Sequence, residues 1–144
     1  MAEKSAQSFA NHVRWDPAFH FFGMPVLLIT FIASIVYAVR FPSLMSGWAV
    51  VFFAAALLLA LKSRLYALRV QDRVIRLEER LRLATIAPQM RTRIEELSEQ
   101  QLIGLRFACD TEAAALAERA LKDKLSRQDI KKSVVGWRAD YWRV

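Results

Sequence analysis

Two apolar stretches decide the fold of this chain: FFGMPVLLITFIASIVYAV at residues 21–39 and LMSGWAVVFFAAALLLAL at residues 44–61. Neither contains a charged side chain, and their lengths of 19 and 18 residues approach the roughly 20 that a helix needs to cross about 30 Å of hydrocarbon. Helices that are apolar on every side need cover all round, which the rest of a 144-residue chain is too small to supply. We therefore predict two membrane-spanning helices rather than the buried core of a soluble protein.

The connector between the two spans is only four residues long, 40–43, so the helices must run antiparallel. Both termini then lie on the same side of the membrane. Basic residues are concentrated beyond the outer ends of the spans, whereas the connector carries Arg40 alone. By the positive-inside bias, we expect a multi-pass protein of a cell inner (cytoplasmic) membrane with both termini in the cytoplasm.

The second span is expected to continue beyond the membrane as a helical stalk over residues 62–87, because no proline or glycine lies between Gly47 and Pro88. Alternating steps of four and three residues along it give an apolar heptad seam. A coiled-coil stalk and a helix packed on the C-terminal domain are both compatible with the seam, and we favour the second because three heptads are marginal as an isolated coil. The seam expected to pack against another helix comprises Ala56, Ala60, Ala67, Val70, Val74, Leu77 and Leu81.

Most of the net charge of +7 lies on the stalk, since residues 62–88 carry seven basic and three acidic side chains. Lys62, Arg64 and Arg69 lie near enough to the second span to reach anionic lipid headgroups, at about 1 kcal/mol each. The alternative is a solvated face that only fixes the topology. The candidates for binding a protein partner are the more distant Arg73, Arg76 and Arg80, together with Trp137 and Tyr141 near the C-terminus.

A small bundle of short helices is expected over residues 88–144, with Pro88 in the first turn of a new helix. Ser98 with Gln101, and Ser126 with Asp129, have the spacing of a capping box. The helix between them is expected over residues 112–125 with Asp110 or Thr111 as its cap, and the last helix is expected to carry Ile130, Val134, Trp137 and Tyr141 on one face.

The fold class predicted from these patterns is all-α. An N-terminal cytoplasmic or interfacial segment, 1–18, precedes a transmembrane hairpin, 19–61. The basic helical stalk, 62–87, and the C-terminal cytoplasmic helical domain, 88–144, complete the chain.

The histidines His12 and His20 are the weak candidates for a cofactor site, since imidazoles from several copies could ligate haem or a metal. They do not share a helical face well, no third ligand is near them in the sequence, and histidines at a membrane interface are commonly hydrogen-bonded anchors. The single cysteine, Cys109, excludes an internal disulfide and a cysteine-rich metal site. We therefore expect neither a cofactor nor a metal.

Signatures of catalysis are missing from the sequence: it has no nucleophile elbow, no glycine-rich phosphate loop and no HExxH. We therefore expect that the protein is not an enzyme. The spans contain no ionisable side chain, which argues against a pump or transporter. From residue 89 onward there are eleven basic and nine acidic residues, far from the basic footprint of a nucleic-acid-binding domain, so nucleic acid is a disfavoured partner.

Both ends of the chain resemble those of an uncharacterised bacterial family of small two-span inner-membrane proteins, a resemblance that implies this topology and no activity. The residues that carry it at the N-terminal end are Asn11, His12, Arg14, Pro17, Phe19 and His20. Those at the C-terminal end are Leu125, Ser126, Asp129, Ile130, Lys131, Lys132, Trp137, Asp140, Tyr141, Arg143 and Val144.

The leading functional hypothesis is a non-enzymatic, membrane-anchored scaffold or accessory subunit. It would self-associate or bind a partner through its cytoplasmic helices, as a homo-oligomer or as a subunit of a larger membrane complex, with anionic lipids around its anchor. One alternative is a channel-like assembly built from several copies. A second is a membrane-tethered regulator that binds nucleic acid through the last two helices.

Overall fold

Helices make up the regular structure of the protein, which confirms the all-α prediction. The computed structural model describes residues 7–13 and 15–140, and within them it contains helices and a single isolated β-bridge but no strand. These residues fall into two compact units, which we describe separately: 15–69, and 7–13 together with 70–140. The long helix α2, Leu44–Ile86, contributes residues to both units.

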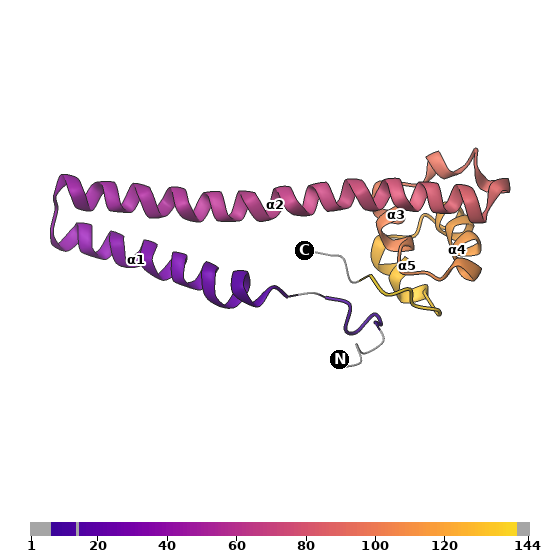
Figure 1. Cartoon of the computed structure of the whole chain (residues 1–144), viewed down its shortest axis with the longest axis horizontal. Helices are drawn as coiled ribbons and strands as arrows, with labels where there is room; N and C mark the ends of the chain where they lie inside the picture. Colours follow the sequence, from indigo (N-terminus) through magenta and orange to yellow (C-terminus); the bar gives the residue numbers. More distant parts are fainter. Residues whose placement is uncertain (1–6, 14, 141–144) are drawn as a thin grey trace. The chain divides into compact units, whose positions relative to one another are not determined.

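The first unit is built from two apolar helical segments that run antiparallel (Figure 1). A π-helical turn, η1 (Ala18–Gly23), leads directly into α1 (Met24–Arg40), and together they form a segment of 23 residues. This segment and α2 are both long and apolar enough to cross a membrane. Only 6% of the apolar window of each is buried inside the protein, so the described residues form no core around either helix.

The π turn has a local cause in the second residue of α1, Pro25. Proline has no N–H to donate, and its ring clashes with the carbonyl group four residues earlier in a regular α-helix. The wider turn immediately before it, in which the N–H of Met24 donates to the carbonyl of Phe19, removes this conflict. The chain can therefore enter α1 without a break.

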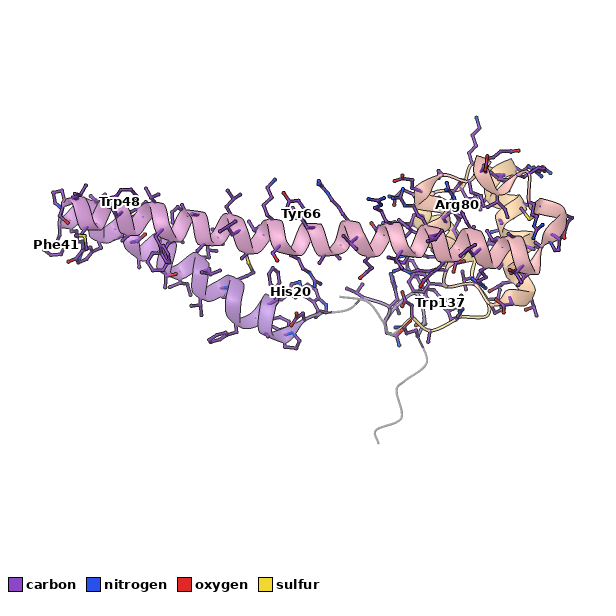
Figure 2. All side chains as sticks on the ribbon, turned by 45° about the horizontal axis from the view of Figure 1, so that its top comes forward. His20, Phe41, Trp48, Tyr66, Arg80 and Trp137 are labelled. Carbon is purple, nitrogen blue, oxygen red and sulfur yellow. The ribbon has the colours of Figure 1, made fainter. Side chains whose placement is uncertain are left out.

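Two serines fix the connector between the helices of the hairpin. The N–H of Ser46 donates to the hydroxyl of Ser43 over 3.1 Å, and the N–H of Ser43 donates back to the hydroxyl of Ser46 over 2.9 Å. The Ser46 hydroxyl also donates to the carbonyl of Phe41 over 3.0 Å. These bonds cap the first turn of α2 and close the loop, so the aromatic residues Phe41 and Trp48 lie at the same end of the hairpin (Figure 2).

The second unit has its own core, formed where short helices gather around the C-terminal part of α2 (Figure 1). The short helices are η2 (Pro88–Met90), η3 (Ile94–Glu96), α3 (Glu99–Leu105), α4 (Asp110–Lys122) and α5 (Arg127–Ser133). The largest fully buried side chains are those of Leu83, Met90, Leu102, Ile103, Leu105, Phe107 and Ile130.

Most of the predicted helix starts are confirmed. Ser98 and Gln101 form the reciprocal capping box at α3, and the hydroxyl of Ser126 accepts the N–H of Asp129 over 3.3 Å at α5. The same hydroxyl donates to the Asp129 carboxylate over 2.6 Å, which lowers the pKa of that carboxyl. The start of α4 was predicted wrongly, because the helix begins at Asp110 after Cys109, whose side chain makes no capping bond.

The prediction for the last helix is wrong beyond Ser133, where α5 ends. The chain continues in an extended conformation along the segment before α4: the N–H of Cys109 donates to the carbonyl of Gly136 over 2.9 Å. The Glu112 carboxylate accepts the N–H groups of Val135 and Gly136 over 3.1 and 3.0 Å. These partners satisfy the backbone groups that a continuing helix would use. Trp137 therefore lies in the β-bridge with Ala108 and on no helical face, and Tyr141 lies outside the described residues.

Gly104 allows α3 and α5 to approach closely, because a Cβ atom at this position would lie 3.2 Å from the Cβ of Ile130 and 3.3 Å from the carbonyl oxygen of Arg127. Gly104→Val is therefore expected to lower the free energy of unfolding by about 2 kcal/mol through overpacking. Gly47, also helical, has nothing within 4 Å of that position, so Gly47→Val is the matched control and should change stability by less than about 0.5 kcal/mol. Denaturant unfolding of the full chain in detergent micelles measures both, and equal losses would contradict the packing described.

Candidate interaction surface

Helix α2 packs on the C-terminal helices through one face, which carries Ile75, Glu79 and Leu83 at intervals of four residues. All three are buried, and Leu83 belongs to the core of the unit. The sequence favours a stalk that packs on the C-terminal domain, and α2 does so. It uses this face, however, and not the heptad seam.

The seam itself is exposed over the part of α2 that belongs to this unit. The exposed fractions are 62% for Val70, 48% for Val74, 61% for Leu77 and 62% for Leu81, and we call these four residues the exposed seam. At 3.6 residues per turn, the exposed seam lies about 170° around the helix from the buried face. The C-terminal helices therefore leave it uncovered. The remaining predicted seam residues, Ala56, Ala60 and Ala67, are partly exposed and belong to the other unit.

Charged side chains border the exposed seam on both sides. Arg73 and Arg80 are exposed along one edge, and Glu78 is exposed along the other (Figure 2 labels Arg80). Arg76 was predicted to bind a partner as well, but it forms an ion pair with Glu99 at the start of α3. Of the predicted stalk arginines, Arg73 and Arg80 thus border the seam, whereas Arg76 helps to hold the unit together.

A cluster of charged side chains around the buried Glu79 joins α2 to the start of α4 and to the segment after α5. The Glu79 carboxylate lies 2.9 Å from the guanidinium of Arg82 and 3.4 Å from that of Arg138. Arg82 also contacts the Asp110 carboxylate at 2.7 Å and donates to the carbonyl of Ala108 over 2.6 Å. Burial raises the pKa of Glu79 above its ordinary value of 4.5, while the charges of Arg82 and Arg138 oppose that rise.

This cluster was not predicted, although the sequence holds a signal for it. Ile75 and Leu83 flank Glu79 at four residues on either side, which places a single carboxylate within a second apolar stripe on the helix. A carboxylate in such a stripe is buried with the helix face and needs a cationic partner there. The heptad pattern instead predicted that the opposite face of the helix packs against another helix.

The N-terminal segment is part of the C-terminal unit. The side-chain amide of Gln7 donates to the carbonyl of Asp140 over 3.2 Å and accepts the N–H of the same residue over 2.9 Å. The paired residues are 133 positions apart in the sequence. No local pattern could have predicted this pairing, because the two residues are far apart in the sequence. The side-chain amide of Gln7 bonds the backbone N–H and carbonyl of Asp140 as a neighbouring strand would.

His12, one of the two weak candidates for a cofactor site, lies on the C-terminal unit. Its ring centroid is 5.6 Å from that of Phe107 and 5.8 Å from that of Trp137. The Nζ of Lys131 lies 3.0 Å from its Nε2, and its Nδ1 lies 2.7 Å from the carbonyl oxygen of Phe9. An ammonium group can only donate, so Nε2 accepts and the ring proton is on Nδ1. Both nitrogens are thus occupied by hydrogen bonds.

His20 lies in the other unit, at the start of the hairpin. Its Nδ1 is 2.9 Å from the carbonyl oxygen of Asp16, and its ring stands edge-on to those of Trp15 and Phe19, both at 5.1 Å. This arrangement is typical of an aromatic anchor. Within residues 7–13 and 15–140, no group of three or more His, Cys, Asp or Glu side chains is placed to hold a metal ion.

The three residues predicted to bind lipid headgroups lie on the part of α2 that follows the apolar stretch. Lys62 and Arg69 are exposed. The guanidinium of Arg64 lies over the ring of Phe19, 5.6 Å from its centroid. This cation–π contact joins the start of the first helical segment to α2 within the same unit.

Glu79 makes the stability of the C-terminal unit depend on pH in a predictable direction. Its pKa is raised in the folded chain, so the folded state keeps the proton at pH values where the unfolded state has lost it. Its contribution to stability is therefore fully present below about pH 4.5 and is lost as pH rises through the raised pKa. The free energy of unfolding of the wild type minus that of Glu79→Gln should therefore decrease as the pH rises from about 4.5 through the raised pKa.

Denaturant titrations of the full chain in detergent at several pH values give this difference. Thr85→Ala, at an exposed position of the same helix without an ionisable group, is the control and should give a difference that does not change with pH. A wild-type advantage that grows with rising pH would contradict the prediction, since it would mean that the ion pairs outweigh the burial of the carboxylate.

Docking of the N-terminal segment can be tested by comparing the two histidines. His12→Ala removes the contacts with Lys131 and Trp137 and is expected to speed the hydrogen exchange of residues 7–13 several-fold. His20→Ala should leave the exchange of this segment unchanged, because His20 belongs to the other unit. Equal exchange of the segment in wild type and His12→Ala, measured by mass spectrometry, would show that His12 does not hold it.

The comparisons with known proteins give one match. No curated protein and no solved structure matches the chain. One family model matches residues 1–144, in agreement with the resemblance to an uncharacterised family seen at both ends of the sequence. The chain therefore belongs to the family of unknown function DUF6526.

Proposed function

We propose that the protein is a non-enzymatic membrane scaffold: its hairpin is an anchor in the lipid, and its C-terminal unit binds a partner or another copy on the cytoplasmic side. The observation that carries this proposal is the contrast between the two units. Only 6% of the apolar windows of the hairpin is buried, whereas residues 7–13 and 70–140 enclose an apolar core of their own.

Lipid is the environment that suits the exposed side chains of the hairpin. Transfer of one large apolar side chain out of water is worth about 1.5–3 kcal/mol, and the exposed ones here include Phe22, Ile29 and Phe52. The polar groups of α1 do not oppose insertion, because the hydroxyls of Thr30 and Ser34 donate to carbonyls of their own helix over 2.8 and 2.7 Å. Both features favour a hairpin that spans the bilayer.

The packing of residues 7–13 with residues 70–140 supports one orientation for the whole chain. Residues 7–13 precede the first span, and residues 70–140 follow the second, yet both belong to one compact unit. Segments that pack together must lie on the same side of a membrane. The exposed Lys62 and Arg69 after the second span favour the cytoplasmic side of an inner membrane, where they are well placed for anionic headgroups.

The C-terminal unit offers a binding surface on the exposed face of α2. The buried Glu79 carboxylate pairs with Arg82 of the same helix and with Arg138 of the segment after α5. What the unit presents to the outside is the exposed seam with Arg73, Glu78 and Arg80 beside it. An apolar stripe bordered by charge is typical of a protein-binding surface.

The anchor is tested by extraction of membranes that contain the full chain. The protein is expected to stay in the membrane pellet after an alkaline carbonate wash, and protease added to inside-out vesicles should remove the C-terminal unit. A variant with Leu28→Arg and Phe52→Arg, two charges within the hydrocarbon, should lose most of its membrane retention, at about 2.5–3.5 kcal/mol for each arginine. The matched control is Leu77→Arg, which changes an exposed leucine outside the apolar stretch.

The same preparation distinguishes the scaffold from a channel. Liposomes that contain the pure protein should show no ion flux above empty liposomes, and native mass spectrometry of gently extracted complexes should find the protein with additional subunits. Release of the wild type by the alkaline wash, or a steady ion flux, would overturn the proposed function.

A further inference from the structure

We infer that the exposed seam binds the same seam of a second copy, as a parallel, in-register coiled coil. The inference rests on the proposed function, because two hairpins inserted in the same sense make their helices leave the membrane in the same direction. The occupant of the seam is then another copy of this chain.

The positions of the seam residues fit a two-stranded coil. With Val74 and Leu81 at a and Val70 and Leu77 at d, every one of the four core positions is aliphatic and at least 48% exposed in the single chain. The C-terminal helices pack on the opposite side of α2, about 170° away. Two seams can therefore meet without either C-terminal unit standing between them.

The charges beside the seam select the orientation of the partner. In this register Arg73 is at g and Glu78 is at e. In a parallel coil, a g residue lies beside the e residue five positions further along the other helix, so Arg73 meets Glu78 of the second copy, and the reverse pair forms by symmetry. In an antiparallel coil, g residues face g residues, which would bring arginines together.

The pair between Arg73 and Glu78 cannot form within one chain. Residues five positions apart on a helix are separated by about 140° and do not face each other. Neither Arg73 nor Glu78 is buried against the C-terminal helices, where Arg76 already pairs with Glu99. Their charges are thus placed for a partner along the seam.

The shortness of the seam agrees with an interaction that depends on the membrane. The exposed seam spans residues 70–81, fewer than two heptads, and an isolated coil of this length is at best marginal in water. Two copies anchored in one bilayer meet at a raised effective concentration and in one orientation, which removes much of the cost of association. The dimer is therefore expected in bilayers and to weaken as the detergent concentration is raised.

Cysteine cross-linking tests the register in liposomes that contain the full chain with Cys109→Ser. Val70→Cys and Leu81→Cys, each made alone, should give disulfide-linked dimers on mild oxidation, because equivalent core positions of a parallel coil bring Cα atoms within about 7 Å. Arg69→Cys, next to Val70 but off the seam, is the control and should give at least fivefold less. Cross-linking only in a mixture of the Val70→Cys and Leu81→Cys chains would indicate an antiparallel pair and overturn the inference.

Charge reversal tests the partner of Arg73. Glu78→Arg should raise the dissociation constant of the dimer roughly fivefold or more, because two attractive pairs become repulsive. Adding Arg73→Glu to the same chain should restore dimer formation, which a general loss of folding would not allow. Native mass spectrometry from nanodiscs measures both.

The two proposals fail in different ways. A chain that resists alkaline extraction but stays monomeric, with no preference for cross-linking at positions 70 and 81, would overturn the dimer and leave the membrane scaffold standing. A chain released from the membrane would overturn the scaffold itself.

Discussion

The structure depends on the apolar side chains of the hairpin finding an apolar environment outside the chain. Residues 18–61 contain few polar groups, and the helices that they form bury almost none of their apolar surface against the rest of the protein. No arrangement of the short C-terminal helices could cover them, because these helices already enclose a core of their own. In the proposed function, a bilayer supplies these contacts to the surfaces of the two helices that the chain leaves exposed.

One helix meets two different demands along its length. The first part of α2 is apolar on all sides, as a helix in lipid must be. Its second part carries two separate stripes: Ile75, Glu79 and Leu83 face the C-terminal core, and the exposed seam faces away from it. The buried stripe tolerates a carboxylate because Arg82 and Arg138 lie beside it. The exposed seam has aliphatic side chains that no described part of the chain covers, so it is the surface that we propose for a partner.

Local patterns predicted the features that local physics determines. The lengths of the apolar stretches predicted the two long helices, the four-residue connector predicted their antiparallel course, and Ser98 and Ser126 predicted the starts of α3 and α5. Each of these depends on residues a few positions apart.

The features that could not be predicted depend on contacts between distant segments. The end of α5 is decided by Glu112 and Cys109, which bind the backbone of residues 135–136, and the place of His12 is decided by Lys131. For the candidate surface, too, part was predicted from a local pattern and part depends on contacts between distant segments. The heptad pattern correctly grouped the residues of the exposed seam on one face, but only the packed structure shows that the C-terminal helices cover the opposite face.

The contact of the hairpin with lipid can be measured directly with spin labels in bilayers. A label at Phe52→Cys in the chain with Cys109→Ser reports on the middle of the second span, and one at Glu118→Cys reports on an exposed position of α4. A hairpin in the bilayer predicts that molecular oxygen, which concentrates in lipid, relaxes the label at position 52 far more than a water-soluble nickel complex does, with the opposite preference at position 118. Strong relaxation of both labels by the nickel complex would contradict a membrane-spanning hairpin.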